Sequence, residues 1–311
     1  MLPCLAPAEG FAATKSHAAH HSHHKKHHGS RSHISANHFS ALVVDGDSGK
    51  VIYSKSASSM RYPASLTKMM TLYLTFDALK KGKIRLDQTM MVSAKAARQP
   101  ATNISLEKGD RLPVRIAIQS VVVRSANDSA MALGEALGKT EWNFALMMTK
   151  KARELGMKDT VFRNPSGLPD NKQHTTAFDM ARLAIALRRD FPEYYHYFSL
   201  TSFDYNGVTY PGHNHVMERH PEMVDGVKTG YIRASGYNLV TSAHRDGHHL
   251  VAVIMGGRTS ESRDSQMVTL LDRTFAQLAG KRKSLADDAP LEDDNALEAS
   301  NAAPVQTAQG F

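Results

Sequence analysis

Ser65 and Lys68 are residue types that can form a nucleophile and its base. They lie in the stretch Pro63-Ala64-Ser65-Leu66-Thr67-Lys68, which is followed by a mostly apolar run. Residues three apart on a helix are neighbours, so the lysine amine can reach the serine hydroxyl. A serine hydroxyl is a weak nucleophile near neutral pH and needs such a base. A single Ser-x-x-Lys pattern is also typical of a capping serine beside an exposed lysine, so this pair alone does not establish catalysis.

Two further segments carry polar residues that fit the same chemistry. Ser125-Ala126-Asn127 lies between two helical patterns, and Lys228-Thr229-Gly230 lies in a strand-like run. A lysine and a hydroxyl on a strand suit a carboxylate, and the glycine lets a substrate backbone approach closely. Each segment also has a purely structural explanation, as a helix cap and as an edge-strand lysine. In this order, however, Ser-x-x-Lys, Ser-x-Asn and Lys-Thr-Gly form a set typical of penicillin-binding proteins and serine β-lactamases.

With these motifs, the chain resembles the low-molecular-weight penicillin-binding proteins, the serine D-alanyl-D-alanine carboxypeptidase family. The resemblance covers roughly residues 39–275 and includes the block Asn164-Pro165-Ser166-Gly167-Leu168. It implies an α/β fold of the α+β arrangement, like that of β-lactamases and transpeptidases. An antiparallel sheet built from N- and C-terminal strands would be flanked by helices, and a helical subdomain would be inserted between the strands. The active site would lie in the cleft between sheet and subdomain.

The resemblance assigns catalytic roles to four residues. Ser65 would be acylated by the substrate, and Lys68 would activate it. Ser125 would relay a proton towards the leaving amine, while Asn127 would hold Lys68 and the substrate amide. Lys68 can act as a base only when it is neutral. Burial and the like charge of Lys228 would both lower the pKa of Lys68 from about 10.4.

The resemblance also implies a substrate-binding strand and an oxyanion hole. The binding residues carried over are Lys228, Thr229, Gly230, Tyr231 and Arg263. The backbone N–H groups of Ser65 and Tyr231 would hold the developing oxyanion. This chemistry requires no metal and no organic cofactor.

Three positions near these motifs bear on substrate detail. Arg263 matches the place where relatives keep an arginine for the terminal carboxylate, and Arg258 is the alternative. Ile232 stands where many relatives have threonine after Lys-Thr-Gly-x, so a hydroxyl is missing next to the oxyanion strand. Ser166 stands where several relatives have histidine. Neither departure concerns the nucleophile itself.

The surrounding patterns predict the elements that must position these residues. Strands are expected at residues 39–45, 51–55, 203–210, 224–231, 237–243 and 250–255, with hairpin turns at Asn206-Gly207 and at 245–248. Helices are expected from Ser65 to about Lys81, at 129–137, 141–155, 180–187 and 266–278, and 114–123 is a short apolar stretch. The helix at 141–155 is expected to be amphipathic around Trp142, Phe144, Ala145, Met148 and Ala152. Strands at both ends with helices between them predict one sheet assembled from distant segments.

Composition limits the classes of protein that the chain can be. It has 311 residues, of which 41% are hydrophobic and 22% charged, enough for one large domain with a core. We predict that domain at residues 38–280. No apolar run reaches the roughly 18–20 residues that span a membrane. The net charge of +8 suits an anionic cell envelope as well as nucleic acid. Zinc-finger spacing and a basic recognition helix are both missing, so nucleic acid is not a predicted partner.

Residues 1–13 read as the remnant of a secretory signal peptide. They contain small residues suitable for cleavage but lack a basic start, so we expect the signal to be truncated here. We therefore expect a periplasmic or cell-surface protein. The single cysteine, Cys4, would leave with the signal, although a lipid-modified Cys4 is an alternative. The mature protein would then need no disulfide in an oxidising compartment.

The two remaining segments are compositionally biased. Residues 14–37 are rich in histidine, and we expect a disordered linker there. An alternative is a metal or cell-wall binding segment, whose weak candidate ligands are His20, His21, His23, His24, His27 and His28. Residues 281–311 form an acidic, alanine-rich tail that we expect to be disordered. The tail is not a basic amphipathic helix, so membrane anchoring is not supported.

The resemblance to this family implies a serine-type carboxypeptidase that removes the terminal D-alanine from peptidoglycan stem peptides through an acyl-enzyme on Ser65. β-Lactams would acylate the same serine. A D,D-endopeptidase of the same family shares every motif. A class A β-lactamase fits less well, because that class has Ser-Asp-Asn and a loop glutamate. A further alternative is a histidine-rich metal or cell-wall binding protein with an idle catalytic domain.

Overall fold

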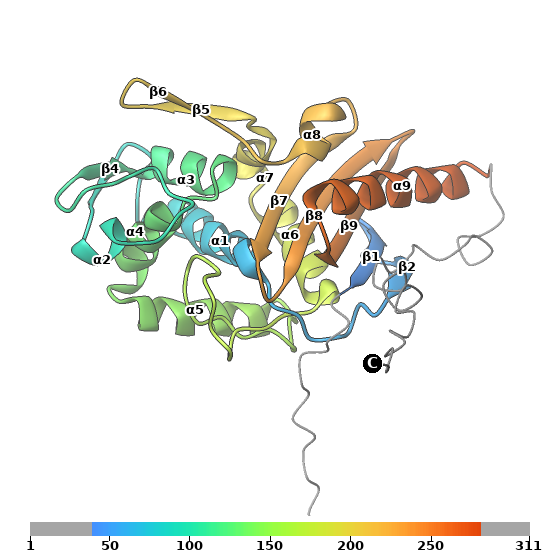
Figure 1. The fold of residues 1–311 in the computed structure, drawn as a ribbon, viewed down its shortest axis with the longest axis horizontal. Coiled ribbons are helices and arrows are strands. Elements are labelled where there is room, and N and C mark those ends of the chain that lie inside the picture. The colour runs from blue at the N-terminus through green and yellow to red at the C-terminus, as the bar shows by residue number, and fades with distance from the viewer. Residues whose placement is uncertain (1–38, 281–311) are drawn as a thin grey trace, which may run out of the picture. The chain divides into compact units, whose positions relative to one another are not determined.

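A five-stranded antiparallel sheet, in the order β2-β1-β9-β8-β7, forms one part of the protein (Figure 1). The computed structural model describes residues 39–280, and the predictions for 1–37 and 281–311 lie outside them. The strands of the sheet are β1 Ser40–Asp45, β2 Val51–Lys55, β7 Val224–Ile232, β8 Gly236–Arg245 and β9 His248–Gly257. The predicted sheet from distant segments is confirmed.

Both faces of this sheet are buried, because successive side chains along a strand point into different apolar clusters. On β1, Ala41 and Val43 belong to one apolar cluster, which also contains residues of the C-terminal helix α9, Ser260–Leu278. Leu42 and Val44 belong to the other cluster, which contains the helices on the opposite face. Successive side chains on a strand point to opposite faces, so a strand that is apolar at every position is buried on both sides.

Most of the helices lie in the chain between β2 and β7, where the sequence predicted an inserted helical subdomain. They are α1 Thr67–Lys80, α2 Ala94–Ala97, α3 Val114–Val123, α4 Asn127–Gly138, α5 Glu141–Glu154, α6 Ala177–Asp190, α7 Pro192–Tyr195 and α8 His215–Arg219. All residues of α1 except Asp77 and Lys80 are buried. A helix that is apolar all round must run through a core, and α1 has α3, α4, α5 and α6 as neighbours.

Two short hairpins complete the described chain. One pairs β3 Thr89–Met91 with β4 Arg111–Pro113, and the other pairs β5 Ser202–Tyr205 with β6 Val208–Pro211. The second has Asn206 and Gly207 at φ of 50° and 76°, which confirms the predicted turn. The pair β3–β4 and the helices α2, α7 and α8 were not predicted, because such short elements carry little periodicity.

Local sequence signals account for most helix boundaries. Thr140, Thr176 and Thr259 cap α5, α6 and α9 by accepting a backbone N–H with the side-chain oxygen. One detail of α5 is wrong in the prediction: Trp142 is 53% exposed rather than packed inside, with the guanidinium of Arg163 over its ring at 4.6 Å. Among residues 39–280, no helix combines the length and apolar character needed to cross a bilayer.

Candidate active site

Ser65 lies in a tight turn, and a side chain of the sheet holds the residues just before it by hydrogen bonds. The 3-10 turn Ala64–Leu66 leads directly into α1. Asn238 on β8 donates its side-chain N–H to the backbone carbonyls of Tyr62 and Pro63 at 3.1 and 3.2 Å. On the neighbouring strand, an added Cβ at Gly230 would lie 3.0 Å from the backbone nitrogen of Ser65. A side chain at Gly230 would press on the backbone of the nucleophile's turn, so glycine suits this close approach of β7.

The amine of Lys68 is buried beneath Ser65 and has three polar neighbours. Its Nζ lies 3.0 Å from Ser65 Oγ, 2.7 Å from Asn127 Oδ1 and 2.5 Å from the carbonyl oxygen of Ser166. A neutral amine has two N–H donors and one lone pair. Its two donors match the two carbonyl oxygens, and its lone pair is left for the Ser65 hydroxyl.

Electrostatics favours the neutral form of Lys68. Burial lowers its pKa well below the usual 10.5, and the positive charge of Lys228 lowers it further. The carboxylate of Asp128 acts in the opposite direction, to a smaller extent. The lowering of the Lys68 pKa by burial and by Lys228, expected from the sequence, is therefore confirmed.

The block Asn164-Pro165-Ser166-Gly167-Leu168 supplies the Ser166 carbonyl through a turn. Asn164 Oδ1 accepts the backbone N–H groups of Ser166 and Gly167 at 3.2 and 2.7 Å. Thr71 on α1 donates its hydroxyl to the Pro165 carbonyl at 2.7 Å, which ties the turn to the nucleophile's helix. Gly167 has φ +87°, and an added Cβ there would collide with the carbonyl of Ala64. This turn therefore needs glycine for two reasons.

Ser125 and Asn127 approach Lys68 from the helical part. Asn127 begins α4, and its Nδ2 donates to the Pro100 carbonyl at 2.8 Å while its Oδ1 accepts from Lys68. Ser125 has φ 58° in the left-handed region that L residues seldom adopt. Its hydroxyl is buried and has no hydrogen-bond partner among residues 39–280. Strain and an unpaired buried hydroxyl are features that cluster at functional sites.

Lys228, Thr229 and Gly230 lie on β7, facing these groups. Lys228 is buried, and burial with the charge of Arg263 lowers its pKa from 10.5 to about 7. Its Nζ donates to the Thr229 carbonyl at 3.0 Å. A buried cation whose pKa is perturbed by a like charge, beside a cavity, is a typical functional-site group.

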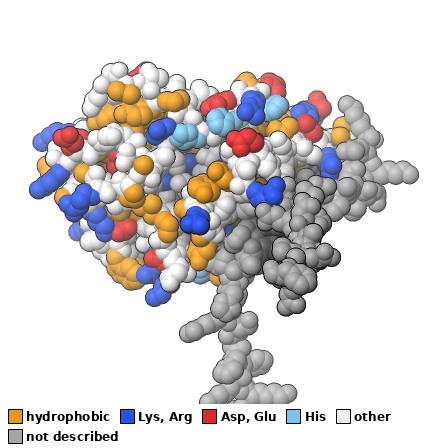
Figure 2. All heavy atoms as spheres, viewed as in Figure 1, with side chains coloured by type: hydrophobic (Ala, Val, Ile, Leu, Met, Phe, Trp, Pro, Cys, Tyr) orange, Lys and Arg blue, Asp and Glu red, His pale blue; other side chains and the backbone are white. Residues whose placement is uncertain are grey.

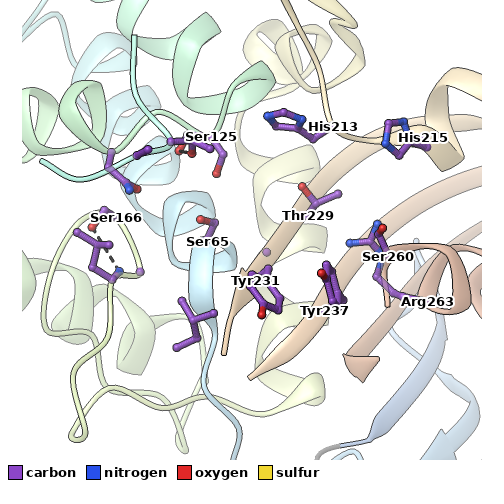
Figure 3. Close-up of a pocket in the computed structure, with 17 residues that line it drawn as sticks. Ser65, Ser125, Ser166, His213, His215, Thr229, Tyr231, Tyr237, Ser260 and Arg263 are labelled. Carbon is purple, nitrogen blue, oxygen red and sulfur yellow. Dashed lines mark hydrogen bonds between the residues drawn. The ribbon is translucent and has the colours of Figure 1, made fainter. Parts of the chain in front are cut away.

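A cavity of about 440 Å³ joins the predicted residues (Figure 3). Its lining includes Ser65, Ser125, Asn127, Thr229, Gly230 and Tyr231, whereas Lys68 and Lys228 lie behind it. In Figure 3, Ser65 and Thr229 face the middle of the cavity from α1's turn and from β7. All nine predicted site residues of the domain therefore lie at or directly behind one cavity.

Arg263 on α9 reaches the cavity, but its guanidinium already has protein partners. Nε and Nη2 donate to Asp264 Oδ1 at 2.9 and 2.6 Å, and Nη1 donates to the Asn238 carbonyl at 3.2 Å. A substrate carboxylate at this place would have to compete with Asp264. Arg258, the alternative from the sequence, is not part of the cavity lining.

His213 and His215 line the cavity and were missed by the sequence analysis. Nε2 of His213 lies 3.2 Å from Nη1 of Arg124. Arginine only donates, so Nε2 accepts and the proton of the neutral ring lies on Nδ1. Burial, then Arg124 and Lys228, then His215 lower the pKa of His213, and Glu218 opposes them. His213 is thus a neutral donor polarised by Arg124, which local sequence patterns could not reveal.

Comparisons with known proteins identify one family that the chain matches. The model of the D-alanyl-D-alanine carboxypeptidase family, Peptidase_S11, matches residues 24–259. The chain is 34% identical to the D-alanyl-D-alanine carboxypeptidase DacF of Bacillus subtilis (strain 168), over 76% of this chain and 62% of the relative. It is also 34% identical to DacA of Escherichia coli (strain K12), over 76% of this chain and 60% of that relative. The matches thus span about 60% of these relatives' length.

Solved structures agree with the sequence matches. Penicillin-binding protein 5 from Haemophilus influenzae superposes with a TM-score of 0.74 at 34% identity, covering 76% of this chain and 70% of that one. The cefotaxime-bound penicillin-binding protein D2 from Listeria monocytogenes has a TM-score of 0.70 at 25% identity, covering 78% and 99%. The fold expected from the sequence is confirmed. The chain belongs to the D-alanyl-D-alanine carboxypeptidase family of peptidases.

Proposed function

We propose that this protein is a serine-type D,D-carboxypeptidase that removes the terminal D-alanine from peptidoglycan stem peptides. The observation that carries the proposal is the position of Lys68 Nζ, 3.0 Å from Ser65 Oγ with two carbonyl acceptors for its own N–H groups. The lone pair of a neutral amine in this place is free to take the serine proton. General bases act at hydrogen-bond distance from the proton that they abstract.

Acylation would begin at the carbonyl between the last two D-alanines. Ser65 Oγ attacks the carbonyl carbon while its proton moves to Lys68 Nζ, and the carbonyl electron pair moves to oxygen. The N–H groups of Ser65 and Tyr231 hold that oxyanion. When the tetrahedral species collapses, the C–N bond breaks, and the leaving amine takes the proton of Lys68 through Ser125, which leaves Lys68 neutral again. D-Alanine departs, and an ester on Ser65 remains.

Hydrolysis of the ester would use the same groups in reverse. A water molecule loses a proton to Lys68 and attacks the ester carbonyl. The C–Oγ bond then breaks, and Ser65 recovers its proton. Lys228, Thr229 and the cavity end near Arg263 would hold the terminal carboxylate during acylation. A β-lactam presents a reactive amide and a carboxylate in a similar arrangement, so it would acylate Ser65 as well.

Similarity supports the carboxypeptidase over the endopeptidase. Relatives named as D-alanyl-D-alanine carboxypeptidases are 33–35% identical over about three quarters of this chain. A D-alanyl-D-alanine endopeptidase from Pseudomonas aeruginosa is 27% identical over a similar share. Peptidoglycan lies outside the cytoplasm, so this activity would be exerted in the periplasm or at the cell surface.

The deciding experiment measures D-alanine release from diacetyl-L-Lys-D-Ala-D-Ala by the full chain and by Ser65→Ala. Ser48→Ala, in the exposed β1–β2 turn, is the matched serine control. We expect release by the full chain and by Ser48→Ala and loss of release in Ser65→Ala. Release that persists in Ser65→Ala would refute the nucleophile. Cleavage of a cross-linked dimer without release from the tripeptide would instead identify an endopeptidase.

A histidine-rich binding protein with an idle domain is the remaining alternative. Its candidate ligands, His20, His21, His23, His24, His27 and His28, lie outside the residues that the structure describes. Within residues 39–280 there is no cluster of three or more histidine, cysteine, aspartate or glutamate side chains suited to a metal ion. Zinc or nickel binding that disappears on deletion of residues 17–33, without acylation by penicillin, would favour this alternative.

A further inference from the structure

Arg124 and His213 connect two distant parts of the chain along one side of the cavity. Nη1 of Arg124, at the C-terminal end of α3, donates to Nε2 of His213 at 3.2 Å. Arg124 directly precedes Ser125, and His213 lies between β6 and α8. Figure 3 shows Ser125, His213 and His215 in a row along this side. Figure 2 shows histidine side chains at the surface near the middle of this face, next to a Lys or Arg side chain. We call the Arg124–His213 contact the clasp.

Ser125 lies in a strained turn that its surroundings must hold. Its φ of 58° lies in the left-handed region, which a non-glycine residue keeps only where neighbouring structure fixes it. On the helical side, the Thr102 hydroxyl donates to the Ser125 carbonyl at 2.9 Å. The next residue, Ala126, donates its N–H to the Ser120 carbonyl at 3.1 Å. Both bonds tie the turn to the helical part, whereas the clasp ties it to the segment that leads into α8.

The His213 end of the clasp is attached to the sheet. His213 is followed by α8, which packs against β7 and against α9. A space of about 10 Å³ is lined by Val123 of α3, His213 and Lys228 of β7, among others. A space of that size holds at most about one water molecule. His213 is therefore packed closely between the end of α3 and the strand that carries Lys228.

The clasp forms because the ring of His213 is neutral. Burial lowers the pKa of His213, the charges of Arg124 and Lys228 lower it further, and Glu218 opposes them. A neutral imidazole has one acceptor nitrogen, whereas arginine has only donors. Nε of Arg124 is buried and has no hydrogen-bond partner among residues 39–280. His213 thus supplies an acceptor that the other side of the guanidinium lacks.

A shift of this turn would affect the proton relay through Ser125. The Ser125 hydroxyl has no hydrogen-bond partner in the described part of the chain, so the backbone of the turn sets its place. A relay must lie within hydrogen-bond distance of both Lys68 and the leaving nitrogen. A misplacement of about 1 Å can lower a rate on the order of 100-fold.

We propose that Arg124 and His213 are positioning residues whose contact holds the Ser125 turn where Ser125 can pass the proton of Lys68 to the leaving amine. This rests on the proposed carboxypeptidase function and adds two residues to its machinery. In this role both residues act through Ser125 and not on the reacting atoms.

The test compares two substrates that form the same acyl-enzyme but differ in their need for a proton. Both have the acyl group diacetyl-L-Lys-D-Ala; one is the amide of D-alanine, and the other is the thioester of mercaptoacetate. The amide nitrogen must take a proton as the C–N bond breaks. A thiolate leaves without one as the C–S bond breaks, and Lys68 then gives its proton to water. Both leaving groups carry a carboxylate, so a lost contact to that carboxylate affects both substrates alike.

The measured quantity is kcat/KM for the amide divided by kcat/KM for the thioester. We expect His213→Ala and Arg124→Met each to lower this ratio about tenfold. The double variant should lower it no further than either single variant, because each change removes the same contact. Arg124 is not part of the cavity lining, so its effect cannot come from a lost substrate contact. Arg115→Met, at an exposed position on α3, should keep the wild-type ratio.

Equal losses on both substrates would show that the pair only supports the fold, and they would overturn the proposal. So would multiplied losses in the double variant, or a change in Arg115→Met as large as that in Arg124→Met. The proposed reaction can fail separately: the chain would be acylated by penicillin but release no D-alanine. Penicillin also breaks a C–N bond, so its acylation rate then takes the place of the amide value. That ratio should fall about tenfold in His213→Ala, and an unchanged ratio would refute the clasp.

Discussion

The amine nitrogen of Lys68 lies 2.5 Å from the backbone carbonyl oxygen of Ser166, 98 positions later in the chain. This carbonyl and Asn127 Oδ1, which lies at 2.7 Å, each accept one of the two N–H groups of a neutral amine. The lone pair then lies towards Ser65 without competition. A peptide carbonyl cannot be protonated or lost by a side-chain substitution, so the turn at Ser166 is a durable orienting group for the base.

Lys68→Met should abolish acylation while preserving most of the core volume. Methionine has no proton-accepting amine, and a positioned general base contributes about 10²- to 10⁴-fold. The rate of labelling by a fluorescent penicillin measures this loss. Lys150→Met, at an exposed position on α5, should label at the wild-type rate. Labelling of Lys68→Met within tenfold of the wild type would show that another group removes the serine proton.

Lys228 should control the pH dependence of acylation. The reactive form of Lys68 is neutral, so the rate falls as pH drops through the Lys68 pKa. Lys228 has a pKa of about 7 and is positively charged below it, where its charge lowers the pKa of Lys68. Removing that charge raises the pKa of Lys68, so the acid limb of the profile moves to higher pH.

The measurement is the midpoint of that acid limb, from penicillin acylation rates between pH 4 and 9. Lys228→Met should move the midpoint upward, whatever it does to the maximal rate. Lys228→Arg retains a positive charge, so its midpoint should not rise. An unchanged or lower midpoint in Lys228→Met would contradict the electrostatic coupling.

Gly167→Ala should disrupt the contact between the Ser166 turn and the nucleophile's turn. Gly167 combines φ +87° with a backbone carbonyl in the space of a Cβ, whereas Gly156 has φ +77° with nothing within 4 Å. Gly156→Ala therefore measures the cost of the left-handed conformation alone, roughly 1–2 kcal/mol. We expect a larger loss of unfolding free energy and slower penicillin acylation in Gly167→Ala. Equal effects in both variants would show that the Ala64 contact does not matter.

The sequence predicted the helices and strands that have a strong pattern of apolar residues or a capping signal. The run after Ser65 is apolar all round, and α1 is buried all round. The predicted strand at 250–255 is uniformly apolar, and it belongs to the sheet together with the predicted strands at 224–231 and 237–243. The spacing of Ser65 and Lys68 also predicted a contact, which the structure has at 3.0 Å.

The remaining features depend on contacts between distant residues. The carbonyl of Ser166 reaches Lys68 because Gly167 adopts a positive φ, and the block's side chains do not indicate which carbonyl will point inward. His213 meets Arg124 from 89 positions away. Trp142 lies outside although its helix is amphipathic, and Phe144, Ala145, Met148 and Ala152 form the buried face of α5. Packing between elements, rather than periodicity, decides such positions.

His249 should make the protein less stable in mild acid. It is buried on β9, its ring is stacked on His244 at 4.3 Å, and its nitrogens contact Ser242 and Asp47. Burial lowers its pKa, with smaller lowering by His244 and Arg188, while the Asp47 carboxylate raises it. The unfolded chain therefore binds a proton near pH 6.5 that the folded protein does not bind. Stability is lost as pH falls from about 6.5 towards the lowered folded pKa.

Urea unfolding at pH 7.5 and pH 5.5 measures this loss. Glutamine is neutral at both values, so His249→Gln should lose less unfolding free energy between them than the wild type. His248→Gln, one residue earlier in the strand and partly exposed, should retain the wild-type difference. If the unfolding free energy of His249→Gln falls between pH 7.5 and pH 5.5 by as much as that of the wild type, other groups cause the acid sensitivity. The comparison between variants cancels the titration of residues that all three proteins share.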